Sequence, residues 1–133
     1  MDNMSEVLGR AARIVNRFAD KRLKPFDLTT QQFIFLKSAF PKPIPMTRLA
    51  EVLGCDRTTA SRNSLRLEKR GLICYARVDD KRINSITLTP QGLTLLQNAL
   101  PVWKAIDDAL VDYIEAQNIE GIISKLIVLC KFK

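Results

Sequence analysis

The chain has 133 residues, of which 47% are hydrophobic and 26% charged, enough for one folded domain with a buried core. Its formal net charge of +7 favours a polyanionic partner. Histidine is absent and the motifs GxGxxG, GxxxxGK[ST] and GxSxG do not occur, which removes most zinc chemistry, Ser-His or Cys-His catalysis and the common nucleotide loops. We therefore expect no enzyme, no metal site and no cofactor.

Compartment signals are few but consistent. No run of about 18 apolar residues occurs, so we expect no membrane span. The N-terminus carries Asp2 and Glu6 and lacks the apolar segment of a secretory signal. Cys55, Cys74 and Cys130 are scattered, without metal-ligand spacing. These features predict a cytoplasmic protein.

The first part of the chain predicts helices. Apolar residues recur three and four apart over 4–23, which indicates an amphipathic helix that ends before Pro25. Thr29 and Gln32 have capping-box spacing and predict the start of a second helix. The segment 41–45, PKPIP, is predicted to be a stiff connection.

Two short helices are expected next. Thr47 is predicted to cap the first, and Gly54 to end it in a left-handed conformation. Asp56 is predicted to cap the second because its carboxylate can accept from the first free amides. Gly71 is expected to end it.

The hydrophobic period then changes to that of strands. Segments 72–77 and 83–89 are predicted to pair as a hairpin, with the turn at Asp79 and Asp80. The sequence thus predicts one small antiparallel unit among helices.

A long helix is predicted to begin where Thr89 can act as cap and Pro90 occupies the first helical position. It is expected to continue through Leu110, with a kink or shift at Pro101. A final helix is predicted over roughly 118–131.

The middle of the chain has helix-turn-helix spacing. Ala50, Gly54 and Ala60 stand where two short helices cross near a right angle, the small residues permitting close approach and the glycine taking the turn. In the second helix Ala60, Ser64 and Leu67 share the inner side. The residues expected on its other side are polar or basic, apart from one leucine: Thr58, Ser61, Arg62, Leu65, Arg66 and Lys69.

Positive charge is concentrated around this helix and the hairpin. Residues 56–82 contain eight basic and four acidic side chains, a balance of +4, whereas the residues from 83 onward contain four basic and five acidic ones, a balance of −1. Such clustering is typical of proteins that bind a nucleic-acid groove.

Three consecutive segments, LAEVLGCDRTTASRNSLRLEKRGLI, DDKRINSITLTPQG and NALPVWKA, together resemble the MarR family of winged helix-turn-helix regulators. The motifs are Asp-x-Arg at 80–82 and Leu-Thr-x-x-Gly at 88–92, and the resemblance covers roughly 5–115. It implies a mostly α fold with a small β-hairpin wing (α+β). A single domain, 1–133, would comprise dimerisation helices at 1–24 and 90–133 and a winged helix-turn-helix lobe at 29–89.

The resemblance also implies that the protein binds double-stranded DNA. The helix after Asp56 would lie in the major groove and the hairpin tip in the adjacent minor groove. Arg62 can offer two parallel donors to a guanine, and Ser61 accompanies it. Thr58 could meet a base or phosphate, or be a plain first-turn hydroxyl. Leu65 could touch a thymine methyl or pack on the wing. The expected phosphate contacts are Arg57, Arg66 and Lys69.

At the hairpin tip, Arg82 is predicted to enter the minor groove, where negative potential attracts guanidinium groups. Asp80 would hold that arginine or its turn, and Lys81 would add charge. For Ser61 and Arg62 the alternative is a solvated helix face. For Asp80 and Arg82 the alternative is an exposed ion pair in the turn.

A sensing site follows from the resemblance alone, as a pocket for a small aromatic or acidic effector. The residues that could line it are Arg13, Arg17, Phe18, Phe33, Trp103 and Tyr113; the alternative is plain core. Cys55 precedes a helix N-terminus, where a thiolate is favoured, although a buried structural thiol is the alternative.

Together these features predict a sequence-specific DNA-binding regulator, a ligand-responsive repressor acting as a homodimer on an inverted repeat. The alternative is a protein-interaction module that kept the fold without specific DNA binding. Ser64, where the resembling subgroup usually has an apolar residue, and the outward Leu65 motivate that alternative.

Overall fold

The computed structural model describes residues 2–77, 84–117 and 121–132. Its elements are α1 (Met4–Leu23), the 3-10 turn η1 (Lys24–Phe26), α2 (Thr30–Ser38), β1 (Ile44–Pro45), α3 (Met46–Leu53), α4 (Arg57–Lys69), β2 (Ile73–Arg77), β3 (Asn84–Leu88), α5 (Pro90–Ala116) and α6 (Ile122–Leu129). The fold is mostly helical with one small antiparallel sheet, as the sequence predicted.

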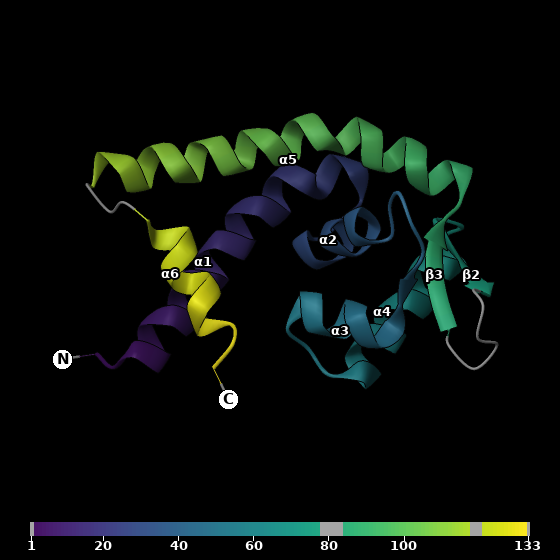
Figure 1. Ribbon diagram of the computed structural model, residues 1–133. Helices are drawn as coiled ribbons and strands as arrows, with labels where there is room; N and C mark the ends of the chain where they lie inside the picture. Colours follow the sequence, from purple (N-terminus) through teal and green to yellow (C-terminus); the bar gives the residue numbers. More distant parts are fainter. Residues whose placement is uncertain (1, 78–83, 118–120, 133) are drawn as a thin grey trace.

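The elements form two regions that α5 joins. Figure 1 shows α5 extending along one side of the molecule, with α2, α3, α4 and the sheet gathered beneath its first half. Beneath its second half lie α1 and α6, and both chain ends are on that side, away from the sheet. None of the helices in the described residues combines the length and apolarity needed to cross a bilayer.

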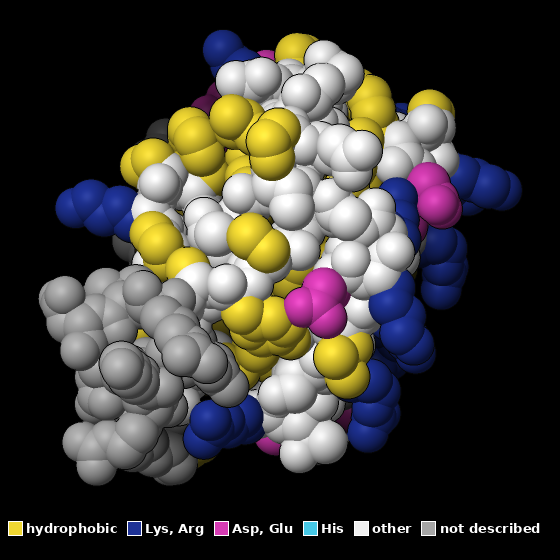
Figure 2. All heavy atoms as spheres, turned by 90° about the vertical axis from the view of Figure 1, so that its right-hand side faces the viewer, with side chains coloured by type: hydrophobic (Ala, Val, Ile, Leu, Met, Phe, Trp, Pro, Cys, Tyr) yellow, Lys and Arg dark blue, Asp and Glu magenta, His cyan; other side chains and the backbone are white. Residues whose placement is uncertain are grey.

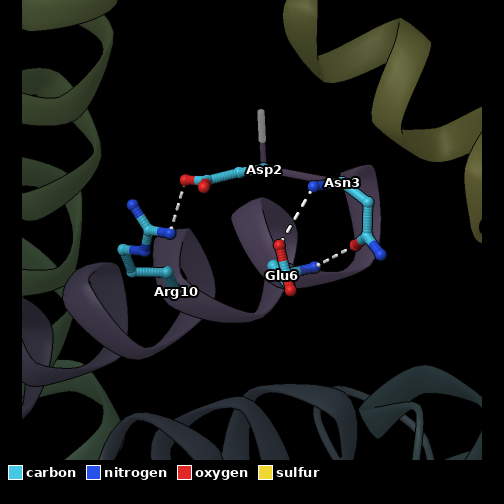
Figure 3. Close-up of polar contacts among 4 residues, drawn as sticks. All are labelled: Asp2, Asn3, Glu6 and Arg10. Carbon is cyan, nitrogen blue, oxygen red and sulfur yellow. Dashed lines mark hydrogen bonds and ion pairs between the residues drawn. The ribbon is translucent and has the colours of Figure 1, made fainter.

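Helix α1 begins with a capping box. The Asn3 side chain accepts from the Glu6 amide at 2.9 Å, and the Glu6 carboxylate accepts from the Asn3 amide at 3.0 Å (Figure 3). Arg10 forms an ion pair with Asp2 at 2.7 Å. Although the helix is amphipathic, only its last turns are buried, which leaves most of its apolar side chains exposed.

The predicted capping box of α2 is confirmed, with Thr29 and Gln32 exchanging hydrogen bonds. A second anchor comes from α1, where the Asp20 carboxylate accepts from both the amide and the hydroxyl of Thr30, at 2.7 and 2.6 Å. These bonds satisfy orphan amides at the helix start and fix α2 against α1.

The segment before α3 differs from its prediction in two ways. Thr47 does not cap α3, because the helix begins at Met46 with Pro45 in the cap position and no side-chain cap. Residues 41–45 are not only a connection, since Ile44 and Pro45 pair with Ile86 and Ser85 of β3. Two residues, one of them a proline, carry too little periodicity to indicate a strand.

The two predicted strands are confirmed to within one residue at their outer ends, which lie at Ile73 and Leu88. Strands β2 and β3 pair antiparallel, Ile73 with Leu88 and Arg77 with Asn84, and in the described residues the strand order is β1-β3-β2. The turn predicted at Asp79 and Asp80 lies outside the described residues.

The start of α5 explains the Leu-Thr-x-x-Gly motif physically. Thr89 caps the helix by accepting from the Gly92 amide at 3.0 Å, and its hydroxyl donates to the carbonyl of Gly71 at 2.6 Å. The Thr89 amide donates to the carbonyl of Leu72 at 3.1 Å. Gly92 is buried directly against that carbonyl, where a side chain has no room. The motif therefore attaches α5 to the turn between α4 and β2.

Helix α5 continues through Pro101 to Ala116 as a single helix, which curves gently in Figure 1. Helix α6 begins at Ile122, four residues later than the predicted 118. Gly121 adopts a left-handed conformation before it, and such a residue stands outside the helix.

One hydrophobic core unites α2, α3, α4 and the sheet with the first half of α5. Its largest fully buried side chains include Phe33, Phe35, Leu36, Leu49, Leu67, Ile73 and Ile86. The rings of Phe33 on α2 and Trp103 on α5 stack with centroids 4.5 Å apart. By contrast, α6 has no buried residue, and neither the lobe nor the core covers it.

Candidate nucleic-acid interface

The turn between α3 and α4 has the predicted construction. Gly54 ends α3 in the left-handed region, with φ of 66°. Asp56 then caps α4, its carboxylate accepting from the Thr59 amide at 2.7 Å. That hydrogen bond lowers the pKa of the Asp56 carboxyl from its usual 3.8, and the Thr59 hydroxyl and the charge of Arg62 lower it further.

The lowered pKa predicts the acid behaviour of Asp56→Asn, which keeps a good capping side chain. A carboxyl whose pKa is lower in the folded chain stabilises the fold above its unfolded pKa, and this contribution is lost as the pH falls through the folded-state value. The stability difference between parent and variant should therefore stay constant above about pH 5 and shrink progressively below it. Thermal melts at fixed protein concentration measure this; a difference that is the same at all pH values would contradict it.

One side of α4 is buried as predicted. Ala60, Ser64 and Leu67 have no exposed surface and face the core. Their spacing of four and three residues places them in one row along the helix.

The opposite side of α4 is an exposed row. Thr58, Arg62, Leu65 and Lys69 follow one another at intervals of four, three and four residues, so they share one face. All four are exposed, and Leu65 keeps 50% of its surface accessible. We call these four residues the outer row of α4; it offers a hydroxyl, a guanidinium, an apolar group and an ammonium group in sequence.

The remaining predicted contacts on α4 lie beside this row. Arg57 is exposed at the first turn, and Ser61 is half-buried at the edge of the inner side. Arg66 is exposed on the flank that turns towards α1 and α2. There it lines a cavity of about 540 Å³ together with Lys69, Arg70 and Lys24.

The C-terminal end of α4 is attached to the α1–α2 corner. Arg70 forms an ion pair with Asp27 at 3.5 Å, and Asp27 itself has a left-handed backbone with φ of 53°. Because the Asp27 carboxylate is almost fully exposed, this pair contributes little stability.

Figure 2 shows the side of the molecule that lies to the right in Figure 1. Lysine and arginine side chains gather along one edge of this face, while its middle is largely apolar or uncharged. The predicted wing residues Asp80, Lys81 and Arg82 lie outside the described residues.

The six residues predicted for an effector pocket differ in their depth in the fold. Phe33 and Trp103 stack in the core, and Phe18 packs against the core with the Arg22 guanidinium 3.5 Å from its ring centre. The others are exposed: Arg13 and Arg17 on α1, and Tyr113 on the second half of α5.

The three cysteines differ in exposure. Cys55, in the turn before α4, is half-buried and packs against the core, as a structural thiol would. Cys74 on β2 and Cys130 after α6 are exposed.

One contact at the site was not anticipated. The Oγ of Ser64 lies 2.8 Å from the hydroxyl of Tyr75 on β2. Ser64, the polar residue on the buried side of α4, therefore has a hydrogen-bond partner on the first strand of the hairpin. The departure of Ser64 from the apolar pattern was visible in the sequence, but its partner was not, because the two residues approach only when β2 packs on α4.

No family profile matches the sequence. A helix-turn-helix transcriptional regulator of Bacillus cereus, itself uncharacterised, is 34% identical over 112 residues, which are 84% of this chain and 75% of the relative. This relationship extends well beyond the helix-turn-helix segment.

Solved structures of regulators share the fold. The transcriptional repressor CouR, bound to a 23-mer DNA duplex, superimposes with a TM-score of 0.83 at 26% identity, over 97% of this chain and 93% of that chain. MarR of E. coli superimposes with a TM-score of 0.75 at 22% identity, over 95% of this chain and 98% of that chain. With its capped α4, hairpin and long α5 in the same arrangement, the chain belongs to the MarR family of winged helix-turn-helix DNA-binding transcriptional regulators.

Proposed function

We propose that the protein is a ligand-responsive repressor that binds an inverted-repeat operator as a homodimer. The observation that carries this proposal is the outer row of α4, which stands opposite the buried Ala60, Ser64 and Leu67 and presents Arg62 at its centre. The rigid core behind the helix holds this row in a fixed orientation, as readout of base edges requires.

Within this proposal the basic side chains have different tasks. Arg62 reads a guanine through two parallel hydrogen bonds, with Thr58 and Ser61 beside it. Arg57, Arg66 and Lys69 bind phosphates and fix the position of the helix without reading sequence. Arg82 enters the minor groove from the wing, with Asp80 supporting it and Lys81 adding charge.

The dimer is proposed from the apolar surface of the terminal helices. The exposed apolar side chains there are Met4, Val7, Ile14 and Val15 on α1 and Ile123, Leu126, Ile127, Val128 and Leu129 on α6. A cavity of about 870 Å³ lies between these two helices and the second half of α5. A monomer rarely leaves an apolar surface of this extent in water, and a second copy is the occupant that the family relationship favours.

Ile127→Asp tests the dimer. Ile127 is 54% exposed on α6 and lines the cavity, so a carboxylate there should be buried without a partner if two copies meet on this surface. We expect the variant to sediment as a monomer at concentrations where the parent is a dimer. Val52→Asp is the matched control, because Val52 is 46% exposed on α3, and it should remain dimeric. Equal masses for all three proteins would contradict the assignment.

Ligand response is proposed by analogy with a protein of the same fold. The DNA binding of BpsR from Bordetella bronchiseptica is regulated by 6-hydroxynicotinic acid, and BpsR superimposes on this chain with a TM-score of 0.85 at 19% identity, over 99% of this chain and 96% of BpsR. An aromatic acid is therefore the effector class to test first here. A ligand that binds the free dimer more tightly than the DNA-bound dimer would weaken operator binding. The loss of operator affinity would be limited to the ratio of the ligand's two affinities.

Selection from a random duplex pool at about 150 mM salt tests DNA reading directly. We expect an inverted repeat whose half-sites are centred about 10 base pairs apart, as a symmetric dimer with two recognition helices requires. Recovery of a single unrepeated site would contradict the dimer, and a folded protein that enriches nothing would contradict sequence-specific binding.

The exposed Leu65 favours one second candidate, a protein-interaction module on the same fold. An apolar residue in the middle of the outer row suits a protein surface as well as a thymine methyl. Binding to duplex DNA with a steep salt dependence would favour the regulator, because each phosphate contact releases counterions, whereas salt-insensitive or absent DNA binding would favour the module.

A further inference from the structure

The hydroxyl of Ser64 forms two hydrogen bonds in the interior of the lobe. Its Oγ lies 2.9 Å from the carbonyl oxygen of Ser61, one turn earlier in α4, and 2.8 Å from the hydroxyl oxygen of Tyr75. A serine hydroxyl has a single proton, and a carbonyl can only accept. Ser64 therefore donates to Ser61, and Tyr75 donates to Ser64.

These two hydrogen bonds link the strand β2, through Tyr75, to the backbone of helix α4 at Ser61. Tyr75 is on β2, on the same face of the strand as the buried Ile73, and it pairs with Ile86 of β3. The strand ends two residues later, at Arg77. At the other end, Ser61 is adjacent to Arg62 of the outer row. Two hydrogen bonds thus connect the wing strand to the backbone of α4 beside its central arginine.

We propose that Ser64 and Tyr75 are positioning residues that fix α4 relative to the wing and so determine how selectively the helix reads bases. The inference rests on the proposed function, because it assigns a role within DNA reading. A helix in the major groove and a wing in the minor groove engage one half-site together only when their relative position matches the DNA. Hydrogen bonds are directional and restrict sliding and rotation, whereas an apolar side chain at position 64 would contact the tyrosine ring without a preferred direction.

Burial supports a role beyond filling space. Ser64 has no exposed surface, yet a serine fills less of the core than a larger apolar side chain would. Tyr75 remains 40% exposed, so much of its surface contributes no core packing. The contact between the two residues is made through their hydroxyls, and removal of one oxygen atom from Tyr75 should eliminate it while the ring stays in place.

The experiment compares Tyr75→Phe, Ser64→Ala and the double variant with the parent. The control is Ser38→Ala, because Ser38 on α2 also donates to its own helix, to the Ile34 carbonyl at 2.7 Å, and lies outside the interface. Affinity for the selected operator and for a random duplex is measured by titration well below each melting temperature. Base preference is measured by repeating the selection.

We expect both single variants to bind the operator about three- to tenfold more weakly while their affinity for the random duplex stays unchanged, because the net contribution of one hydrogen bond is of this order and the phosphate contacts remain. The double variant should bind within about twofold of Ser64→Ala, because both substitutions remove the same contact. Base preference should relax at the positions that Ser61 and Arg62 contact, and Ser38→Ala should match the parent.

If the two residues were merely structural, the variants would melt at a lower temperature but keep the parent's ratio of operator affinity to random-duplex affinity. That result would overturn the proposal. Additive effects in the double variant would overturn it as well. These outcomes are separate from failure of the proposed function, in which the parent itself would select no operator.

Discussion

Replacing Arg62 with alanine should lower operator affinity by about 30-fold or more and relax the base preference at one position in each half-site. The magnitude follows from the about 1–3 kcal/mol of discrimination that one bidentate arginine–guanine contact supplies, because the contacts in two half-sites one DNA turn apart add to about 2 kcal/mol or more. Arg62 is exposed at the centre of the outer row, so its removal should not disturb the core. Selection with the variant protein, followed by titration of the parent operator, measures both effects.

Arg66→Ala is the matched comparison, because the residue lies one turn along the same helix but on its flank. Removing a phosphate-binding side chain weakens specific and random duplexes alike. It also makes log affinity depend less steeply on log salt, by about one unit for each phosphate that is no longer neutralised. The expected contrast is therefore altered base preference for Arg62→Ala and an altered salt slope for Arg66→Ala. If the Arg62 variant kept the parent's base preference, that arginine would not be the base reader.

The elements that the sequence predicted well are those with strong local signals. The capping residues Thr29, Asp56 and Thr89 each begin a helix where expected, because a side-chain oxygen three residues before a free amide is a short-range arrangement. Gly54 likewise ends α3 in the expected left-handed conformation. The inner row of α4 follows from helical spacing alone.

The features that the sequence did not predict depend on tertiary contacts. Strand β1 exists because Ile44 and Pro45 reach β3, some 40 positions later in the chain, and two residues have no period of their own. Thr47 lacks a capping role because α3 begins one residue before it. The partner of Ser64 was hidden for the same reason, since Tyr75 approaches it only in the folded lobe.

The candidate site divides in a similar way. The outer row of α4 could be predicted because helical spacing places Thr58, Arg62, Leu65 and Lys69 together. The effector residues stay a prediction, because apolar positions at helical spacing serve a core and a pocket equally well. Phe33 and Trp103 illustrate this ambiguity, since they stack on each other in the core.

Gly92→Ala should destabilise the fold by about 3–5 kcal/mol, enough to lower the melting temperature by more than about 10 °C for a chain of this size. Helix propensity alone predicts the opposite sign, because alanine is more favourable than glycine inside a helix by about 1 kcal/mol. Packing decides the outcome. A Cβ at position 92 would overlap the carbonyl oxygen of Leu72 and lie 2.9 Å from its carbonyl carbon, and both are backbone atoms that cannot rotate away.

Relief of that overlap would require α5 to move away from the end of α4 and β2. The Thr89 amide donates to the same Leu72 carbonyl, and the Thr89 hydroxyl donates to the carbonyl of Gly71, so this movement would break the bonds that attach α5 to the lobe. Gly9→Ala is the matched control. Gly9 lies within α1, where a new Cβ would meet only the flexible end of Arg13, at 3.2 Å.

The control should therefore follow helix propensity and leave stability unchanged or raise it by up to about 1 kcal/mol. Thermal melts of the three proteins at one concentration, held constant because association shifts the melting temperature, would measure both substitutions. Opposite signs for the same glycine-to-alanine change would establish that the glycine of the Leu-Thr-x-x-Gly motif is required by close approach of two backbones. Equal shifts for Gly92→Ala and Gly9→Ala would show instead that α5 can withdraw from the Leu72 carbonyl at no cost, and that its attachment to the lobe depends on the Thr89 cap and the apolar core.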